Sequence, residues 1–296
     1  MDRTLCGAEL ATMEPLWRVN VVESLLVQRM LRKSARVVEM WERAERDWNQ
    51  TLYQMTAYAM GAPRNSRPFE QLAEMVTYLM CLRERGSLVR VEAMLLGASG
   101  LLRGEFFDDY VVRLQEEYEY LAGKYSLHSM NSREWHRGGN FPAGSPVMRI
   151  AQLAAIVAKE EYSVDALLAI RSLADVERLL DVCAGNYWQK IYGPDGGRAR
   201  GAGRIGREKV QMLAINLVVP MQFAYGEVMR DEEMKSQALD LLEQIPSEHN
   251  RLVARWTGAG VPSGNAYDSQ ALIELSHLCD EGRCSECPLA KQLKKA

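Results

Sequence analysis

Three cysteines stand close together near the end of the chain, in the run CDEGRCSECP at 279–288. Thiolates are soft ligands, and Cys284 and Cys287 form a Cys-x-x-Cys pair that can grip one metal ion, while Cys279 could fold back from a preceding helix. The spacing predicts zinc or an iron–sulfur cluster as a cofactor. The candidates for the fourth ligand are His277, Cys6, Cys81, Cys183 and a non-protein group. The alternative interpretation is three ordinary thiols.

A second candidate for chemistry is the Gly- and Arg-rich segment YGPDGGRARGAGRIG at 192–206. Its GAGRIG run matches the G-x-G-x-x-G pattern, but that pattern binds a dinucleotide only between a strand and a helix, and no strand signal precedes it. What remains is charge, because six basic residues stand between Lys190 and Lys209 against only Asp195 and Glu208. The predicted anion- or nucleic-acid-binding residues are Arg198, Arg200, Arg204, Arg207 and Lys209.

This segment runs into a helix that is predicted to begin near Ile205 or Gly206. The free N–H groups of a first helical turn carry partial positive charge, so they and the arginines would converge on one place that suits phosphate oxygens. We therefore expect a phosphate-bearing partner, with nucleic acid as the leading candidate. The alternative is a solvated loop without a ligand.

A third group of polar residues surrounds the expected start of another helix. Arg149 and Gln152 are three residues apart, which places them on one helical face, and the loop before them contains Arg137 and Asn140. The four residues form a predicted polar pocket. In the alternative interpretation, Arg149 caps carbonyl groups of a neighbouring helix.

The elements that must position these residues are helices, because apolar residues recur at spacings of three and four along almost the whole chain. Strand signals are nearly absent. We predict an all-α fold, an irregular multi-helix bundle with short loops and one Gly/Arg-rich loop. The predicted helices cover residues 14–46, 48–60, 66–86, 87–97, 107–122, 146–160, 172–184, 206–226, 231–244, 248–257 and 266–280.

Two stretches rich in Gly and Pro, at 136–146 and 192–206, interrupt the helical pattern and are predicted to be surface loops. They favour an N-terminal helical half, 1–135, and a C-terminal helical half, 147–296, that carries the cysteines. One continuous domain is equally compatible with the pattern.

Two polar features inside the predicted helices receive structural interpretations. Pro220 has no N–H group, so the carbonyl of Asn216 loses its helical partner, and we expect the helix to kink there. Arg29, Lys33 and Arg36 share one face of the first long helix, and we expect that face to be solvated.

The composition restricts the classes of partner. A net charge of −3, from 36 basic and 39 acidic residues, gives no overall attraction to nucleic acid or anionic membranes, so any such affinity must be local. No apolar stretch approaches the roughly 18 residues of a membrane span, and the first ten residues lack a signal-peptide pattern. Six cysteines, three of them scattered singly, fit a reducing compartment. We expect a cytoplasmic protein without a membrane partner, and no feature indicates its oligomeric state.

Several segments resemble, in order, the bacterial domain of unknown function family 2851. They are LLVQRMLRKS (25–34), DWNQTLYQ (47–54), NSRPFEQLA (65–73), VEAMLLGASGLL (91–102), DDYVVRLQEEYEYLAGKY (108–125), NFP (140–142), RIAQLAA (149–155), INLVVPMQFAYGE (215–227) and DSQALIELSHLC with RCSECPL (268–289). The family's activity is unassigned, so the resemblance implies a helical fold more than a reaction.

The resemblance implies that full members also carry a mostly β N-terminal region with acidic residues and a Glu-x-His element suggestive of a nuclease-type metal site. Nothing in this chain matches that region, so we expect the chain to correspond to the helical C-terminal part. The chain departs from the family pattern at Gln28, where Glu is expected, and in the inserted AGSPVM at 143–148.

The sequence thus favours a binding module for a phosphate-bearing partner, with a metal clip at the terminal cysteines. One alternative is part of a DNA- or RNA-processing enzyme whose catalytic region is not in this chain. The spacing of the cysteines, followed by Pro288 and Leu289, is similar to the iron–sulfur loop of endonuclease III-type DNA glycosylases, without their further downstream cysteine. Another alternative is a protein-interaction scaffold without a ligand. No histidine lies in a catalytic motif, so the sequence assigns no reaction.

Overall fold

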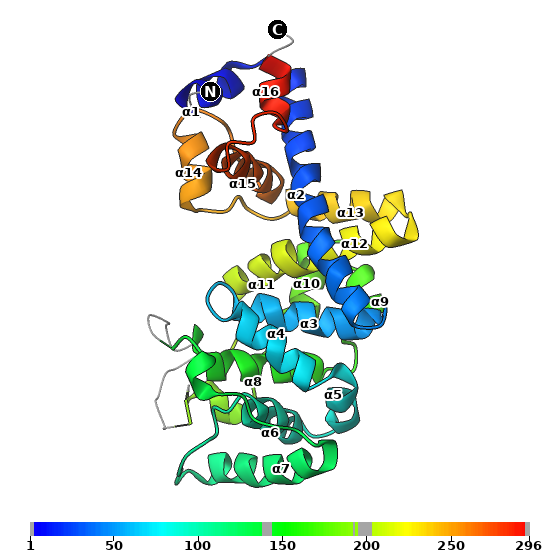
Figure 1. Cartoon of the computed structure of the whole chain (residues 1–296), viewed down its shortest axis with the longest axis vertical. Helices are drawn as coiled ribbons and strands as arrows, with labels where there is room; N and C mark the ends of the chain where they lie inside the picture. Colours follow the sequence, from blue (N-terminus) through cyan, green and yellow to red (C-terminus); the bar gives the residue numbers. More distant parts are fainter. Residues whose placement is uncertain (1–2, 138–143, 192, 195–202, 294–296) are drawn as a thin grey trace. The chain divides into compact units, whose positions relative to one another are not determined.

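The computed structural model describes residues 3–137, 144–191, 193–194 and 203–293, with the side chains of 3–5 excepted. These residues are organised as helices joined by turns and loops (Figure 1), and they contain two isolated β-bridges and no strand. The predicted all-α fold is confirmed. The chain forms two compact units, which are described separately.

Unit 1 comprises Met1–Val38, Arg171–Leu173 and Val219–Ala296. Its helices are α1 (Arg3–Thr12), most of α2 (Pro15–Arg43), α12 (Val219–Met229), α13 (Glu232–Glu243), α14 (Arg251–Thr257), α15 (Ala266–Asp280) and α16 (Pro288–Leu293). Helices α12 and α13 form a closely packed hairpin, and α15 packs against both α13 and α14.

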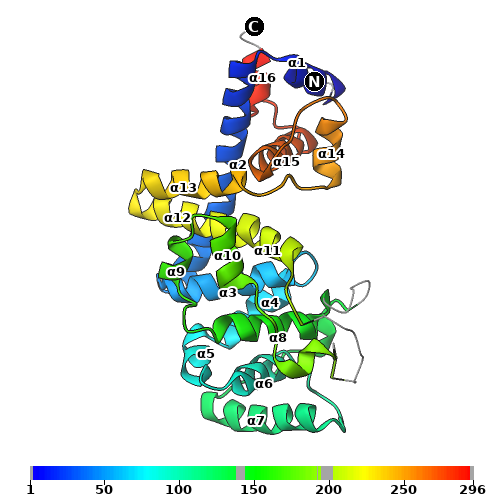
Figure 2. The ribbon, with the colours of Figure 1, turned by 180° about the vertical axis from the view of Figure 1, so that it is seen from behind.

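Unit 2 comprises Glu39–Ile170 and Ala174–Val218. Its helices are α3 (Trp48–Gly61), α4 (Ser66–Met75), α5 (Tyr78–Glu84), α6 (Leu88–Ala98), α7 (Asp109–Tyr125), η1 (Ser132–Glu134), α8 (Pro146–Val157), α9 (Val164–Leu168), most of α10 (Leu173–Leu180), η3 (Asn186–Gln189), α11 (Arg207–Leu213) and η4 (Ala214–Val218). Within unit 2, α7, α6, α8 and α3 follow one another as successive layers (Figures 1 and 2).

Both units take residues from each of the predicted halves, 1–135 and 147–296. Unit 1 combines the start of the chain with about its last quarter, whereas unit 2 is built mainly from the middle. The division of the chain into two halves stays a prediction.

The single helix predicted over 66–86 is wrong, because α4 ends at Met75 and α5 begins at Tyr78. At the break, the Thr77 hydroxyl caps α5, and the side-chain oxygen of Gln50 accepts a hydrogen bond from the Tyr78 backbone N–H at 2.7 Å. In an unbroken helix this N–H would donate to the carbonyl four residues earlier, whereas the first N–H groups of a new helix have no such partner. A side chain from α3 therefore replaces one helical hydrogen bond, which the local sequence pattern does not reveal.

The irregularity expected at Pro220 takes the form of a π-helix, η4, in the turn immediately before it. The side-chain amide of Asn216 donates to the Met212 carbonyl at 3.0 Å, in agreement with the structural role expected for Asn216. A π-turn widens the helix by one residue, which relieves the clash between the proline ring and the preceding turn.

The helical run Arg207–Met229 contains the one stretch, among the described residues, that is long and apolar enough to cross a membrane. Its mean hydropathy is 1.3, and 67% of that stretch is buried inside the protein. Such burial is usual for a helix that belongs to a protein core, so the stretch is weak support for a membrane span.

Candidate anion-binding site

Unit 2 contains a cavity of about 360 Å³ at the loop between α3 and α4, the start of α8 and the start of α11. We call it the basic cavity, because three positively charged side chains line it. Its polar and charged lining residues are Arg64, Asn65, Arg149, Glu208 and Lys209.

The wall formed by the α3–α4 loop is fixed by close backbone packing. A Cβ atom at Gly61 would lie 2.9 Å from the backbone nitrogen of Ser66, so only glycine fits this turn without a shift. The buried Asn65 side chain then holds the segment at His136 on both sides, since its Nδ2 donates to the His136 carbonyl at 3.0 Å and its Oδ1 accepts from the His136 N–H at 2.7 Å.

Helix α8 brings Arg149 to the basic cavity. Ser145 caps this helix by accepting a hydrogen bond from Met148 N–H at 3.2 Å, and Pro146 occupies its first position, where no N–H group is needed. The Arg149 guanidinium donates to Gln152 Oε1 at 2.9 Å, and Gln152 Nε2 donates to the Gly203 carbonyl at 3.2 Å. The buried Gln152 therefore orients the guanidinium.

Lys209 of α11 reaches the basic cavity from another side. It is 7% exposed, and its Nζ donates to the Ala59 carbonyl in the last turn of α3 at 2.7 Å. This carbonyl also accepts a long hydrogen bond from the Ala62 N–H at 3.4 Å, and a cation near a helix C-terminus can bond such last-turn carbonyls. Lys209, and not Arg149, is thus the residue that caps a neighbouring helix.

Both of these cations are electrostatically uncompensated within the part of the chain that the structure describes. Burial lowers the pKa of the Arg149 guanidinium to about 10. Two causes, burial first and repulsion from Arg149 to a smaller extent, lower the pKa of the Lys209 amine to about 7. Among the described residues, neither side chain forms an ion pair with a carboxylate, and Glu208, which also lines the cavity, is exposed.

Arg64 adds a third positive charge at the rim of the basic cavity. It is exposed, and its Nη1 lies 2.8 Å from His136 Nε2. The arrangement can accept an anion at a site where Lys209 and Arg149 are already desolvated, with the Arg64 guanidinium at its rim.

The structure places the residues predicted in and after the Gly/Arg-rich segment in different surroundings. Arg198 and Arg200 lie outside the described residues. Arg204 donates from both Nε and Nη2 to Asp181 Oδ2, at 3.1 and 2.7 Å, and this pairing raises the pKa of Arg204. Arg207 is exposed on the first turn of α11. Lys209 is thus the member of this set that the structure places in the basic cavity.

The predicted polar pocket is divided in a similar way. Arg149 and Gln152 contact each other directly, Arg137 is exposed, and Asn140 lies outside the described residues. The structure therefore brings Arg149 of the predicted polar pocket to the same cavity as Lys209 of the Gly/Arg-rich segment and its helix. In the numbering, 60 positions separate the two residues. Sequence reasoning missed Arg64 and Asn65, for which the turn signal GAPRN between two predicted helices was the available clue.

The three terminal cysteines differ in their exposure to solvent. Cys287 is buried, Cys279 is half-buried and Cys284 is exposed. Among the described residues, no group of three or more Cys, His, Asp or Glu side chains is placed to hold a metal ion. Burial, followed by repulsion from Arg32, lowers the pKa of His277. The metal site at Cys279, Cys284, Cys287 and His277 stays a prediction.

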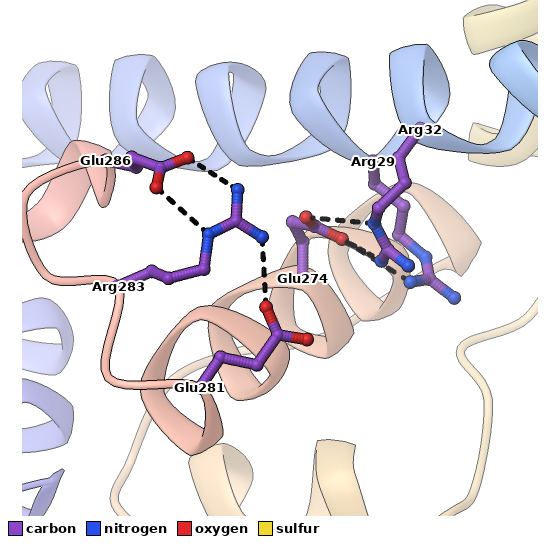
Figure 3. A network of polar contacts seen from close by, with 6 residues as sticks. All are labelled: Arg29, Arg32, Glu274, Glu281, Arg283 and Glu286. Carbon is purple, nitrogen blue, oxygen red and sulfur yellow. Dashed lines mark hydrogen bonds and ion pairs between the residues drawn. The ribbon is translucent and has the colours of Figure 1, made fainter.

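The loop that carries these cysteines is closed by ion pairs within the protein (Figure 3). Arg283 contacts Glu281 on one side, with 3.0 Å between the charged atoms, and Glu286 on the other. Glu281 and Glu286 are exposed, and Arg283 is half-buried. These contacts link Arg283 to residues on both sides of it in the loop.

Unit 1 contains a second group of cations, on α2, and here two of the cations share a buried carboxylate (Figure 3). Glu274 of α15 is 3% exposed and forms ion pairs with both Arg29 and Arg32. Arg29 also donates to Gln270 Oε1 at 2.5 Å. The solvated face expected around Arg29 is therefore wrong, because α15 covers it.

The comparison with protein families identifies the class of the chain. The model of a protein family of unknown function, DUF2851, matches residues 1–251, and the chain belongs to this family. No curated protein and no solved structure matches the chain. The matched range includes the basic cavity and ends before the terminal cysteines, which lie at 279–287.

Proposed function

We propose that this protein is a binding module for a phosphate-bearing partner, nucleic acid in the first instance, and that a phosphate group of the partner enters the basic cavity. The observation that carries the proposal is the pair of desolvated cations, Arg149 and Lys209, at one cavity without a paired carboxylate among the described residues.

The physical support comes from the cost of desolvated charge. A cation taken out of water without a partner costs several kcal/mol, and an anion that enters the same site recovers much of that cost. Phosphate suits the site because Arg149 offers planar N–H donors and Lys209 a compact charge, the two kinds of donor that proteins use for phosphate oxygens.

A purely structural role for Lys209 is the competing explanation, since its amine caps the Ala59 carbonyl. That role accounts for one hydrogen bond and would be served by a neutral amine. It does not account for Arg149 and Arg64 at the same cavity. Binding measurements separate the two explanations.

The test uses a short single-stranded oligonucleotide with a 5′-phosphate, labelled internally with a fluorophore, and measures anisotropy over a range of salt concentrations. We expect the double variant Arg149→Gln, Lys209→Gln to bind about tenfold or more weakly, because it removes two charge-assisted hydrogen bonds. The slope of log affinity against log salt should fall by roughly 1.4, since each contact with a single strand contributes about 0.7.

The matched control is Arg103→Gln, which removes one exposed positive charge elsewhere in unit 2. It should leave the affinity and the salt slope close to those of the wild-type protein. Equal binding by the double variant and the wild-type protein, with equal slopes, would contradict the proposal.

We also propose a structural metal clip at Cys279, Cys284 and Cys287, which is supported by their spacing and by the partial burial of two of the thiols. Metal analysis of the protein purified without oxygen, together with its absorption spectrum, distinguishes zinc from an iron–sulfur cluster. Metal content that is unchanged in Cys284→Ser would contradict the clip.

A further inference from the structure

We propose that the basic cavity selects a phosphate monoester at the end of a nucleic-acid strand over a phosphodiester inside the strand. This inference rests on the proposed function and adds the class of ligand. The juxtaposition that carries it is the buried Lys209, the half-buried Arg149 and the exposed Arg64 at one cavity of about 360 Å³.

The burial of Lys209 restricts which phosphate can reach it. Its side chain is 7% exposed and is fixed on the Ala59 carbonyl, so the ligand has to enter the cavity to contact the amine. A terminal phosphate is attached through one ester bond and can enter with its three free oxygens first. An internal phosphodiester is attached on both sides, so both flanking sugars would have to enter with it.

The charge at the cavity also favours the monoester. The lining supplies three basic groups, Arg64, Arg149 and Lys209, against the exposed carboxylate of Glu208. A phosphate monoester carries about −1.5 to −2 near pH 7, because its second pKa is about 6, whereas a phosphodiester carries one negative charge. The surplus of positive charge is better matched by the dianion.

The size of the basic cavity is consistent with a small end group. At about 360 Å³ it lies at the lower end of the range for small-molecule sites, about 300–1,000 Å³. The volume suits one phosphate and part of the terminal sugar. It does not suit a stretch of strand, which requires a continuous groove.

The experiment compares three oligonucleotides of one sequence, labelled internally, with a 5′-phosphate, a 3′-phosphate or hydroxyl groups at both ends. Affinities for the wild-type protein are measured at pH 6.5 and low salt. We expect at least one phosphorylated strand to bind about tenfold tighter than the strand with two hydroxyl ends. The two phosphorylated arms show which end enters the cavity.

Inorganic phosphate serves as the competitor and needs no variant protein. It should displace the end of the phosphorylated strand from the cavity. At a saturating concentration, the apparent affinity of the phosphorylated strand should fall to that of the hydroxyl-ended strand. In Lys209→Gln and in Arg149→Gln, the preference for a phosphorylated end should fall to about twofold or less, whereas Arg103→Gln should keep it. A thermal melt of each variant confirms that it is folded.

The outcomes separate this inference from the proposed function. Equal affinity for all three strands, with weaker binding in the variants, would leave the proposed function standing and overturn the selection of strand ends. A preference for phosphorylated ends that survives in both variants would also overturn it. Absence of binding to every strand would overturn the proposed function and the inference together.

Discussion

The two groups of cations in this protein differ in what surrounds them. In unit 1, Arg29 and Arg32 enclose the buried carboxylate of Glu274. In unit 2, Arg149 and Lys209 share a cavity without a paired carboxylate among the described residues. The cations of one unit thus contact a buried carboxylate, whereas the described residues of the other unit provide none to Arg149 and Lys209.

The number of basic residues in a segment is therefore a poor guide to whether the segment binds an anion. The face of α2 that carries Arg29 is rich in charge, but α15 covers it at Arg29. Arg204 of the Gly/Arg-rich segment is already paired with Asp181. A cation is available to an anionic ligand when it lacks an intramolecular carboxylate partner, and desolvation makes that lack costly. This criterion points to Lys209 and Arg149.

The largest expected change in stability comes from removing the carboxylate that Arg29 and Arg32 share. Glu274→Gln would leave Arg29, whose side chain is 11% exposed, beside Arg32 without their carboxylate. We expect the free energy of unfolding to fall by about 3 kcal/mol, since removal of one partner leaves a buried charge uncompensated. Urea unfolding at pH 7 measures this change.

The control for that variant is Glu281→Gln, which breaks an ion pair of Arg283 at a carboxylate that is 52% exposed. Its cost should stay below about 1 kcal/mol, because exposed pairs are screened by water. If Glu274→Gln cost no more than this control, Glu274 would not be the group that compensates the α2 cations.

A smaller change in stability is expected from the titration of Lys209. The pKa of Lys209 is about 7 in the folded protein and near 10.5 in the unfolded chain, so the unfolded state binds more protons between these values. The stability of the protein should therefore rise with pH in this window, by about 2 kcal/mol between pH 7 and 9 from this group alone. Below about pH 7 the dependence on pH levels off, because both states then bind the proton and the folded protein bears the full cost of the buried charge.

Lys209→Met isolates this contribution, because methionine fills a similar volume and does not titrate. The difference between the unfolding free energies of the variant and the wild-type protein, measured at pH 7 and at pH 9, should change by about 2 kcal/mol. Parallel pH profiles for the two proteins would show that the amine of Lys209 is not desolvated in solution.

The smallest effect is expected at Arg204, whose side chain is 69% exposed and is paired with Asp181. Arg204→Gln should lower the free energy of unfolding by less than about 1 kcal/mol. It should also change the affinity for a phosphorylated strand by less than about twofold, because the guanidinium is already engaged. A loss as large as that of Lys209→Gln, in the same anisotropy assay, would restore the Gly/Arg-rich segment as the principal site.

Much of the fold could be predicted because helical periodicity and helix stop signals are local. The long helix expected over 14–46 is α2, and the helix expected over 48–60 is α3, whose start is capped by Asp47. The short helices α9 and α16 were missed, since a stretch of five or six residues is too short to show a helical period.

The candidate site could be predicted only in parts. The sequence alone determined that the chain is helical, that Pro220 disturbs one helix, and that Arg149 and Lys209 are polar residues near helix starts. Only the tertiary structure decided that these two cations meet at one cavity, that Asp181 occupies Arg204 and that Glu274 occupies Arg29. The physical reason is that a helix forms from neighbours along the chain, whereas the compensation of a charge depends on groups that are distant in sequence and are brought close by packing.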